Sequence, residues 1–453
     1  MRSSTIPARA GHFDVRRNNL EIVLRHLWAV GPDSRAGVAT RAGLTRATVS
    51  RLVAELMDLG LVGPTGVAPA RGQGRPSTQL ALTGRHVLAI GAEVNVDYLA
   101  VLAVDLANRE IYQRRRAFDA QRAGPALSLR ALAEMCDECM MTLPMTLAGR
   151  KRIIAGLGVA IPGLVDEAHG IVSCAPNLGW DDIPVLPALR DHLGQRVGTV
   201  TIGNDANRAA IAEYRVGSHA GTSNLVYVTG EVGIGGGMIV HDKPLLGSRG
   251  YGGEVGHMTL NPDGPMCGCG RHGCWEAFVG LNALLSITGG PVSITGGPVP
   301  ATAQPGGLGA PGAPGASGAP GAQPEEPGRP PQGSPEDKIA FVVAGANAGD
   351  QGVLTALAEL GRYVGIGAAN IAKIMNPDVI ILGGYFTAIA EWILPAARES
   401  LRAGLLAPDS SGCELTTSTL GFMAAARGAA IDIVDRVMSN PHHLLTGSPH
   451  RFR

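Results

Sequence analysis

One stretch of the sequence, Gly252–Glu276, concentrates residues suited to binding a metal ion. Its three cysteines, Cys267, Cys269 and Cys274, form a C-x-C-x4-C group, and His257 is the nearest imidazole upstream. Three thiolates and one imidazole make a closed tetrahedral ligand set of the kind that holds structural zinc. Glycines between these residues allow the backbone to wrap tightly. We therefore expect His257 and the three cysteines to bind Zn²⁺.

A disulfide and a plain buried core are the competing interpretations of these cysteines. A disulfide between residues so close in sequence would close only a strained ring, and the N-terminus, MRSSTIPARAGHFD, lacks the apolar segment of a secretory signal. Small buried cysteines would explain two thiols better than three clustered among glycines. The total of seven cysteines is odd, which suits a reducing compartment. Zinc is the interpretation that the pattern favours.

The same stretch resembles the signature of the ROK family, which joins sugar kinases and sugar-responsive repressors. It reads G-E-x-G-H, followed by C-x-C-G-x-x-G-C-x-E. The resemblance implies that Glu254, His257 and Glu276 line a sugar, while His257 also binds the zinc ion. These two roles of His257 are compatible, because one ring nitrogen can ligate the ion while the other faces a sugar hydroxyl. The metal would then organise the sugar pocket without doing chemistry.

The charge of the chain is unevenly distributed. Residues 1–85 contain twelve arginines and five acidic residues, a local charge of +7, whereas the whole chain of 453 residues is neutral. A basic part attached to an acidic remainder indicates one module that faces nucleic acid. The length predicts two or three domains, and no run of eighteen apolar residues predicts a membrane span. We expect a cytoplasmic, nucleoid-associated protein with no membrane partner.

The basic part has the pattern of a helix-turn-helix. Apolar residues at i, i+3, i+4 and i+7 predict a helix over 15–30. Ser34 can cap a short second helix, Gly43 makes a tight turn, and Thr45 can cap a third helix over Arg46–Leu59. In a helix-turn-helix the last helix enters the major groove by its N-terminal residues.

The third helix is expected to bury one face and to leave the other face for DNA. The predicted buried stripe consists of Val49, Leu52, Val53 and Leu56. The predicted DNA contacts on this helix are Thr45, Arg46, Ala47, Ser50 and Arg51. Strands at Leu61-Val62 and Leu80–Leu82 would make a two-stranded wing, from whose tip Arg75 could reach a minor groove. A small helical domain for protein contacts is the alternative, which the basic wing disfavours. The segment also resembles the winged helix of ROK-family repressors.

The rest of the chain resembles the two-lobed α/β body of the actin/hexokinase (ribonuclease H-like) type. The runs His86–Val94 and Leu99–Leu106 predict a hairpin that opens the first lobe. In ROK kinases the turn of this hairpin carries Asp-x-Gly-Gly-Thr, which holds the phosphates of ATP. The corresponding run here, Glu93–Asp97, lacks both glycines and the threonine. Asp97 would also place a negative charge beside a triphosphate.

A glycine-rich turn, Gly230–Gly237, departs from the kinase pattern as well. Such turns can cradle phosphates through their backbone N–H groups. The kinase form has glycine and threonine where this chain has Glu231 and Val232. A hydroxyl that would face a phosphate is lost, and a negative charge is gained. We therefore expect no ATP cofactor and no enzymatic activity.

The run Asn204-Asp205-Ala-Asn207 lies where a strand is expected to lead into a helix. An acid at such a junction can be no more than a helix cap, and the residues alone leave that alternative open. The match of N-D-A-N-x-A-A-x-A-E to the ROK family implies that Asn204 and Asp205 bond sugar hydroxyls. In a kinase Asp205 would accept the proton of the attacking hydroxyl, so it is a catalytic candidate only in that alternative.

These patterns divide the chain into four parts. They are a winged helix-turn-helix over 1–83, a first α/β lobe over 84–202, a second lobe with the zinc site over 203–438, and a tail over 439–453. Within the second lobe, residues 286–335 contain SITGGPV twice in tandem and then Gly/Ala/Pro triplets. This composition predicts a disordered insertion.

The combined patterns predict a sugar-responsive, DNA-binding regulator of carbohydrate metabolism genes that acts as a repressor. Its expected partners are operator DNA, a sugar or sugar phosphate, and a second copy of the chain, because one recognition helix reads too few base pairs. An active ATP-dependent sugar kinase with an attached DNA-binding domain is the main alternative. A zinc-dependent architectural DNA-binding protein that needs no ligand is the third.

Overall fold

The computed structural model divides the chain into two units. It describes residues 12–68, 77–144, 146–147, 149–288, 335–407 and 412–442. The first unit comprises residues 1–228, 236–253 and 418–453, and the second comprises 229–235 and 254–417. The chain therefore passes between the units within β14 (Leu225–Gly230) and β15 (Ile234–Val240). Among the residues that the structure describes, no helix is long and apolar enough to cross a membrane.

Three helices form the N-terminal domain. They are α1 (His12–Val30), α2 (Arg35–Ala42) and α3 (Arg46–Asp58). Ser34 caps α2 by accepting a hydrogen bond of 3.1 Å from the backbone N–H of Gly37, and Thr45 caps α3 by accepting one of 3.1 Å from Thr48. Gly43 has the left-handed φ of 65° that the turn between α2 and α3 requires. The predicted caps and turn are confirmed.

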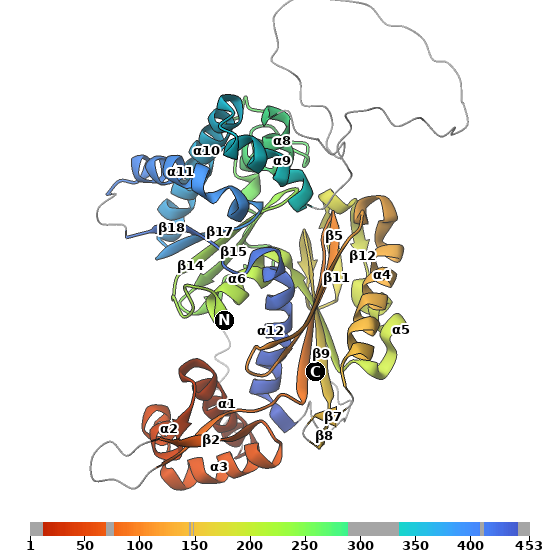
Figure 1. Ribbon diagram of the computed structural model, residues 1–453, viewed down its shortest axis with the longest axis vertical. Helices are drawn as coiled ribbons and strands as arrows, with labels where there is room; N and C mark the ends of the chain where they lie inside the picture. The colour runs from red at the N-terminus through yellow and green to blue at the C-terminus, as the bar shows by residue number, and fades with distance from the viewer. Residues whose placement is uncertain are drawn as a thin grey trace, which may run out of the picture. The chain divides into compact units, whose positions relative to one another are not determined.

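A small antiparallel sheet completes this domain. Strand β2 (Val62–Ala68) pairs with β3 (Ser77–Leu82), and the short β1 (Asp33–Ser34) pairs with the other edge of β3. Strand β1 was not predicted from the sequence; it forms because the residues leading into α2 run beside β3. Helices α1–α3 with this sheet make a winged helix-turn-helix, as predicted (Figure 1). Arg75, the predicted contact at the tip of the wing, lies outside the described residues.

The apolar core of this domain continues into the body of the first unit. The buried stripe of α3 (Val49, Leu52, Val53 and Leu56) is at most 2% exposed, as predicted. It belongs to the same buried cluster as Val434, Val437 and Met438 of α12 (Ala424–Ser439). Figure 1 shows α12, in blue, running from the sheet of the body to the N-terminal domain. The N-terminal domain is therefore docked on the body by apolar contacts, which stabilise it by about 25 cal/mol per Å² of apolar surface buried.

The body of the first unit is built on a five-stranded sheet with the order β13-β9-β4-β5-β6. These strands are β4 (Val87–Val94), β5 (Tyr98–Asp105), β6 (Glu110–Ala117), β9 (Ile153–Ile161) and β13 (Thr199–Asn204). Strand β4 pairs in parallel with β9 and antiparallel with β5, so the predicted hairpin is confirmed. Strands β4 and β5 are buried along their whole lengths, since α4 (Ala120–Thr142) and α12 pack against the sheet. A three-stranded sheet of β10 (Leu164–Asp166), β11 (Ile171–Ala175) and β12 (Trp180–Ile183) precedes α5 (Val185–Leu193).

Two glycines bring α12 into backbone contact with its neighbours. A Cβ atom added at Gly428 would lie 1.7 Å from the carbonyl oxygen of Arg208 in α6 (Asp205–Val216), and one at Gly91 of β4 would lie 1.9 Å from the carbonyl oxygen of Ala426. A side chain at either position would therefore force the elements apart. Helix α12 is held between the sheet and α6 at the closest approach that backbones allow.

The second unit consists mainly of helices around a parallel strand pair. Strand β17 (Val379–Gly384) pairs with β18 (Glu414–Thr417). The helices are α7 (Trp275–Val279), α8 (Leu281–Thr288), α9 (Pro335–Asn347), α10 (Gln351–Met375) and α11 (Ala390–Gly404). Residues 286–288 of the predicted insertion belong to α8, and 289–334 lie outside the described residues. Each unit therefore combines β-strands with packed helices, as the predicted α/β fold requires.

Candidate functional site

Four side chains of the second unit converge as the sequence predicts for a metal site. The ligand atoms of His257, Cys267, Cys269 and Cys274 all lie within 4.8 Å of one another. The Nδ1 atom of His257 is 3.7 Å from the Sγ atom of Cys267, and the sulfurs of Cys269 and Cys274 are also 3.7 Å apart. One nitrogen and three sulfurs at these separations match the donor set that zinc prefers in structural sites.

The loop that carries the cysteines is fixed by tight turns and by a tryptophan. Gly273 has a φ of 68°, and a Cβ atom there would lie 1.5 Å from the carbonyl oxygen of Asn261. Isolated bridges pair Thr259 with Cys274 and Met266 with His272. Trp275, which directly follows Cys274, is fully buried, and its indole N–H donates a hydrogen bond of 2.9 Å to the carbonyl of Tyr363 in α10. The thiols are therefore held by packing as well as by their spacing.

The cluster favours protonated thiols at two positions when only protein surrounds them. Burial raises the pKa of Cys267, and the neighbouring Glu276 carboxylate adds to the rise. Burial also raises the pKa of Cys274, whereas backbone and thiol hydrogen bonds bring the pKa of Cys269 below its usual value. A bound cation would reverse this preference, because a metal ion stabilises the thiolate that ligates it.

The predicted sugar residues of the second unit lie beside this cluster, with Glu254 near His257 and Glu276 near Cys267. The Nε2 atom of His257 lies 4.0 Å from the Oε2 atom of Glu254. Glu276 accepts a hydrogen bond of 2.9 Å from the backbone N–H of Ile234 and one of 3.3 Å from the thiol of Cys267. Partial burial raises the pKa of Glu254, Glu276 raises it further, and His257 opposes the rise. His257 thus has one nitrogen toward the thiols and the other toward a carboxylate.

The two remaining predicted sugar residues belong to the first unit, so the five form two groups. Asn204 caps α6: its Oδ1 atom accepts a hydrogen bond of 2.9 Å from the backbone N–H of Asn207. Its Nδ2 atom donates one of 3.0 Å to the carbonyl of Gly163. Asp205 is the first residue of α6, and its Oδ1 atom accepts a bond of 2.8 Å from the N–H of Ala206. The helix cap is therefore Asn204, which also fixes the loop at Gly163.

The structure adds Glu93, a buried acid to which no site role was assigned from the sequence. Glu93 is 1% exposed, at the end of β4, and its Oε1 atom accepts hydrogen bonds of 2.7 Å from the hydroxyl of Tyr98 and 3.3 Å from Asn95. Its Oε2 atom is buried without a hydrogen-bond partner among the described residues. Burial raises the pKa of Glu93 to about 7, with a contribution from the charge of Asp205. The signal in the sequence for this buried acid was a glutamate within an otherwise apolar strand.

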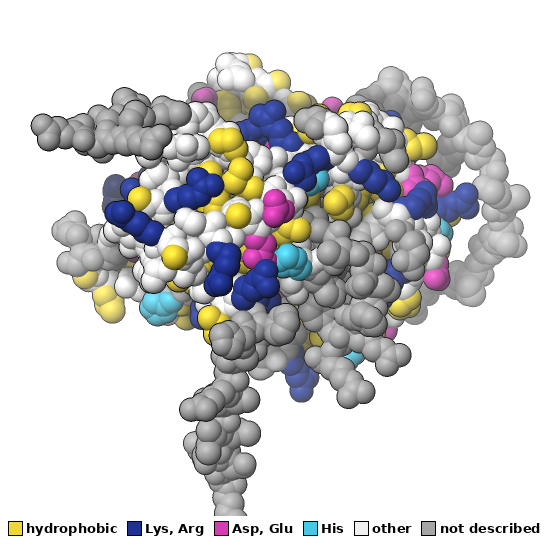
Figure 2. All heavy atoms as spheres, turned by 90° about the horizontal axis from the view of Figure 1, so that it is seen from below, with side chains coloured by type: hydrophobic (Ala, Val, Ile, Leu, Met, Phe, Trp, Pro, Cys, Tyr) yellow, Lys and Arg dark blue, Asp and Glu magenta, His cyan; other side chains and the backbone are white. Residues whose placement is uncertain are grey.

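The predicted DNA-contacting residues of α3 are all exposed. They are Thr45, Arg46, Ala47, Ser50 and Arg51. They occupy the first two turns of α3, on the side opposite the buried stripe that begins at Val49. Figure 2 shows arginine and lysine side chains spread over the surface at this end of the molecule, with fewer acidic side chains among them. This face has the composition that phosphate contacts require.

The fold and this arrangement define a class: an α/β body that contains a His/Cys cluster of the metal-binding type and carries an N-terminal winged helix. The profile of the ROK family matches residues 90–435. The chain belongs to the ROK family.

Two similar proteins differ in how much of this chain they match. The xylose repressor of Bacillus subtilis (strain 168) is 27% identical over 426 residues, which cover 94% of this chain and 97% of the repressor. A glucokinase of Streptomyces coelicolor is 30% identical over 279 residues, which cover 61% of this chain and 79% of the glucokinase. The repressor is thus similar over nearly the whole chain, and the glucokinase over the body.

Two solved structures share the fold. A ROK family transcriptional regulator, described as a homologue of the E. coli MLC protein, superposes with a TM-score of 0.69 at 22% identity and covers 96% of this chain and 100% of that one. A ROK family glucokinase from Streptomyces griseus, in complex with glucose and AMPPNP, gives a TM-score of 0.57 at 24% identity and covers 76% and 98% of the two chains.

Proposed function

We propose that the protein is a transcriptional repressor that binds operator DNA through its winged helix and releases it when a sugar binds to its ROK body. The observation that carries this proposal is the similarity to a xylose repressor over 94% of the chain, which includes the domain that precedes residues 90–435. The similarity to a glucokinase spans 61% of the chain. The relatives that are matched over nearly the whole of this chain, the xylose repressor and the ROK transcriptional regulator, therefore have regulatory names.

The proposed effector is a small aldose, with D-xylose as the first candidate because of the named repressors. Carboxylates are pure acceptors and suit sugar hydroxyls, which donate. Glu254, His257 and Glu276 would contact the sugar from the second unit, and Asn204 and Asp205 from the first. A sugar that binds one state of the body more tightly than the other would shift the population of the DNA-binding state.

A structural zinc ion at His257, Cys267, Cys269 and Cys274 is part of this proposal. The ion would hold the thiols as thiolates and keep the ring of His257 in the orientation that presents Nε2 beside Glu254. Zinc would thereby order the sugar-facing side of the loop. It has no part in a chemical step.

Sugar phosphorylation is the second candidate function, and two features count against it. The turn at Glu93 is filled by a buried carboxyl with its own partners, Tyr98 and Asn95. Val232 cannot offer a phosphate the hydroxyl that a threonine would. In a kinase Asp205 would act as the general base. As a repressor, the protein uses Asp205 only to hold the sugar.

The proposed operator complex contains two copies of the chain. One α3 helix, with its five exposed residues at the N-terminal turns, contacts few base pairs. Two copies related by a two-fold axis would read two half-sites about one or more helical turns apart. Size-exclusion chromatography with light scattering of the free protein, and of its DNA complex, measures this stoichiometry.

The test of the proposed function begins with selection of genomic fragments by the purified protein. Operator affinity is then measured by fluorescence anisotropy with and without D-xylose, D-glucose and L-arabinose. We expect one sugar to weaken operator binding by about 5–150-fold, a typical allosteric coupling. If no sugar changed the operator affinity, the result would favour the alternative of an architectural DNA-binding protein that needs no ligand. ADP release with a sugar at about 1–100 s⁻¹ would establish the kinase.

A further inference from the structure

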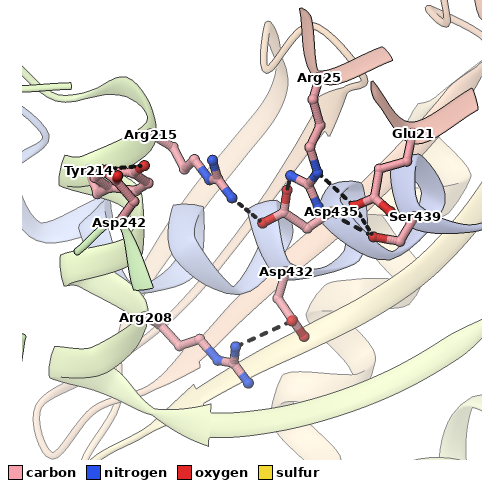
Figure 3. A network of polar contacts seen from close by, with 9 residues as sticks. All are labelled: Glu21, Arg25, Arg208, Tyr214, Arg215, Asp242, Asp432, Asp435 and Ser439. Atoms are coloured by element: carbon pink, nitrogen blue, oxygen red, sulfur yellow. Dashed lines mark hydrogen bonds and ion pairs between the residues drawn. The ribbon is translucent and has the colours of Figure 1, made fainter. Parts of the chain in front are cut away.

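Three helices from distant parts of the chain meet at one carboxylate, that of Asp435 in α12 (Figure 3). Its Oδ1 atom accepts a hydrogen bond of 2.8 Å from Nη1 of Arg25, which belongs to α1 of the DNA-binding domain. Its Oδ2 atom accepts one of 3.1 Å from Nη2 of Arg215, which belongs to α6. Helix α6 begins at Asp205. One carboxylate therefore joins the DNA-binding domain to the helix that carries a predicted sugar ligand.

On the side of the DNA-binding domain, the contact with Asp435 is part of a cyclic hydrogen-bond network among Glu21, Arg25 and Ser439. Arg25 also donates 2.7 Å from its Nε atom to Glu21 and 3.3 Å from Nη2 to Ser439. The hydroxyl of Ser439 donates in turn to Glu21 at 3.0 Å. The side chains of Glu21, Arg25 and Asp435 are 23–33% exposed, so solvent screens their charges less than it screens surface pairs.

Arg215 reaches the DNA-binding domain by a second route. Its guanidinium carbon lies 5.3 Å from the centre of the ring of Trp28, which is in α1, one turn after Arg25. This is within the range of a cation–π contact. Its Nε atom is buried and has no hydrogen-bond partner among the described residues. The position of Arg215 is therefore fixed by its contacts with Asp435 and with aromatic rings.

The N-terminal end of α6, which contains Arg208, is fixed much more firmly than the C-terminal end, which contains Arg215. Arg208, which is 4% exposed, donates 2.9 Å to the carbonyl of Ile202 and forms ion pairs with Glu167 at 3.0 Å and Asp432 at 3.5 Å. Burial alone would raise the pKa of Asp432, but Arg208 and Arg436 lower it, which keeps this carboxylate charged. The backbone of Arg208 also packs against Gly428. This end of α6 can act as a pivot on α12.

The two arginines are seven residues apart, or about 10 Å along the helix. A rotation of α6 about Arg208 would therefore displace Arg215 most. Space for that displacement exists, because a cavity of about 220 Å³ is lined by Tyr214, Arg215, Asp242 and Asp435. Asp242, which accepts a bond of 3.2 Å from the hydroxyl of Tyr214, is a second acceptor on its wall. Arg215 thus has two places to pair.

We propose that Arg215 and Asp435 are the positioning residues that couple sugar binding at Asp205 to the placement of the DNA-binding domain, an inference that rests on the proposed function. When the sugar draws on the first residue of α6, the helix turns about Arg208 and Arg215 moves from Asp435 toward Asp242. The DNA-binding domain then loses the contact between Trp28 and Arg215. Arg25 stays paired with Asp435, which no longer pairs with Arg215. Two alternative pairings of one arginine supply the two-state element that coupling requires.

The test compares Asp435→Asn and Arg215→Met with the wild-type protein. The quantity measured is the ratio of operator Kd values with and without a saturating sugar, D-xylose or D-glucose, whichever acts on the wild type. We expect this ratio to fall at least about fivefold toward one in both variants, whereas the sugar Kd from calorimetry changes less than about twofold. Arg427→Gln is the matched control, because Arg427 also lies in α12 and forms an ion pair, but with Glu110 of β6.

The double variant Arg25→Met/Arg215→Met separates coupling from loss of stability. If one carboxylate transmits the signal, the double variant should lose no more of the ratio than Arg25→Met or Arg215→Met measured beside it, since residues that act together are not additive. Asp435→Glu, which keeps a carboxylate at this position, should restore part of the ratio that Asp435→Asn loses. Variants that bind sugar and keep the wild-type ratio would overturn the inference while the proposed function stands. A wild-type protein whose operator affinity no sugar changes would overturn both.

Discussion

The hydroxyl of Tyr98 donates a hydrogen bond of 2.7 Å to the buried carboxyl of Glu93, across the turn between β4 and β5. By resemblance to ROK kinases, this is the turn that holds ATP phosphates. The ring of Tyr98 packs edge-on against Phe422 with centroids 6.4 Å apart, and the guanidinium of Arg115 lies 5.1 Å from its centre. The side chains at this turn are therefore held by one another, Glu93 by Tyr98 and Tyr98 by Phe422 and Arg115.

Replacing this carboxyl should change how the stability of the protein depends on pH. Burial raises the pKa of Glu93 to about 7 in the folded chain, whereas an unfolded glutamate titrates near 4.3. The folded state binds this proton more tightly, so the stabilisation is complete below about pH 4 and is lost as pH rises through about 7. We expect the free energy of unfolding of the wild type to fall by about 1–3 kcal/mol more than that of Glu93→Gln between about pH 5 and pH 8.

Denaturant unfolding of both proteins at several pH values measures this difference. Glu138→Gln is the control, because the side chain of Glu138 is 40% exposed and pairs with Arg114 at the surface. Parallel pH curves for the wild type and Glu93→Gln would show that Glu93 is already ionised at low pH in the folded protein, contrary to this prediction.

Zinc should be lost when its proposed histidine ligand is removed. We expect His257→Ala to contain much less zinc than the wild type by plasma mass spectrometry and to lose its response to sugar. Binding free energy of structural zinc is also folding free energy, so the variant should melt at a lower temperature. His272→Ala is the matched control: His272 lies in the same loop, exposed, with its Nδ1 atom 3.1 Å from the carbonyl of Gly264. Equal zinc contents in the two variants would exclude His257 from the metal site.

Operator recognition should depend on the first turns of α3. Arg46→Ala and Ser50→Ala should each weaken specific binding by about 1–3 kcal/mol where a base contact is lost, and Arg51→Ala should act similarly. Arg130→Ala is the control, because Arg130 lies in α4 of the body and its side chain is 66% exposed. Anisotropy titrations against the operator and a scrambled duplex separate a loss of sequence-specific binding from a general loss of DNA affinity. An unchanged preference for the operator in all three α3 variants would contradict the proposed DNA-contacting face.

Asp205→Asn should weaken the sugar response without abolishing it. Asparagine is nearly isosteric with aspartate and still hydrogen-bonds a hydroxyl, although it cannot accept a proton as a base. The loss of a charge-assisted hydrogen bond should cost about 1–2 kcal/mol of sugar affinity, measured by calorimetry. A kinase would instead lose its turnover while it kept its sugar, so ADP release that disappears in this variant would favour the enzyme.

The sequence was most informative where local chemistry sets the structure. Ser34 and Thr45 are caps by residue type and position, and the hydroxyl of each accepts the expected backbone hydrogen bond. The spacing of His257 and the three cysteines predicted a cluster that the fold then brought together. These features depend on neighbours within about twenty residues, where short-range geometry leaves few choices.

Features that depend on distant pairing escaped prediction. The strand β1 exists only because β3, more than forty residues later, offers it an edge. Helix α4 runs from Ala120 to Thr142 across non-helical dihedral angles at Gly124 beside Pro125, although a Gly-Pro pair locally favours a turn. Arg25, Arg215 and Asp435 meet across more than two hundred residues. No local pattern marks such a contact.

The most direct test of the account is reciprocity between the two ligands. Binding of the effector sugar to the free protein and to the operator-bound protein is compared by isothermal titration calorimetry. If sugar releases DNA by shifting one equilibrium, the operator must weaken sugar binding by the same factor by which sugar weakens operator binding, about 5–150-fold. The account predicts equal factors. A sugar affinity that is the same in the free and the operator-bound protein would contradict it.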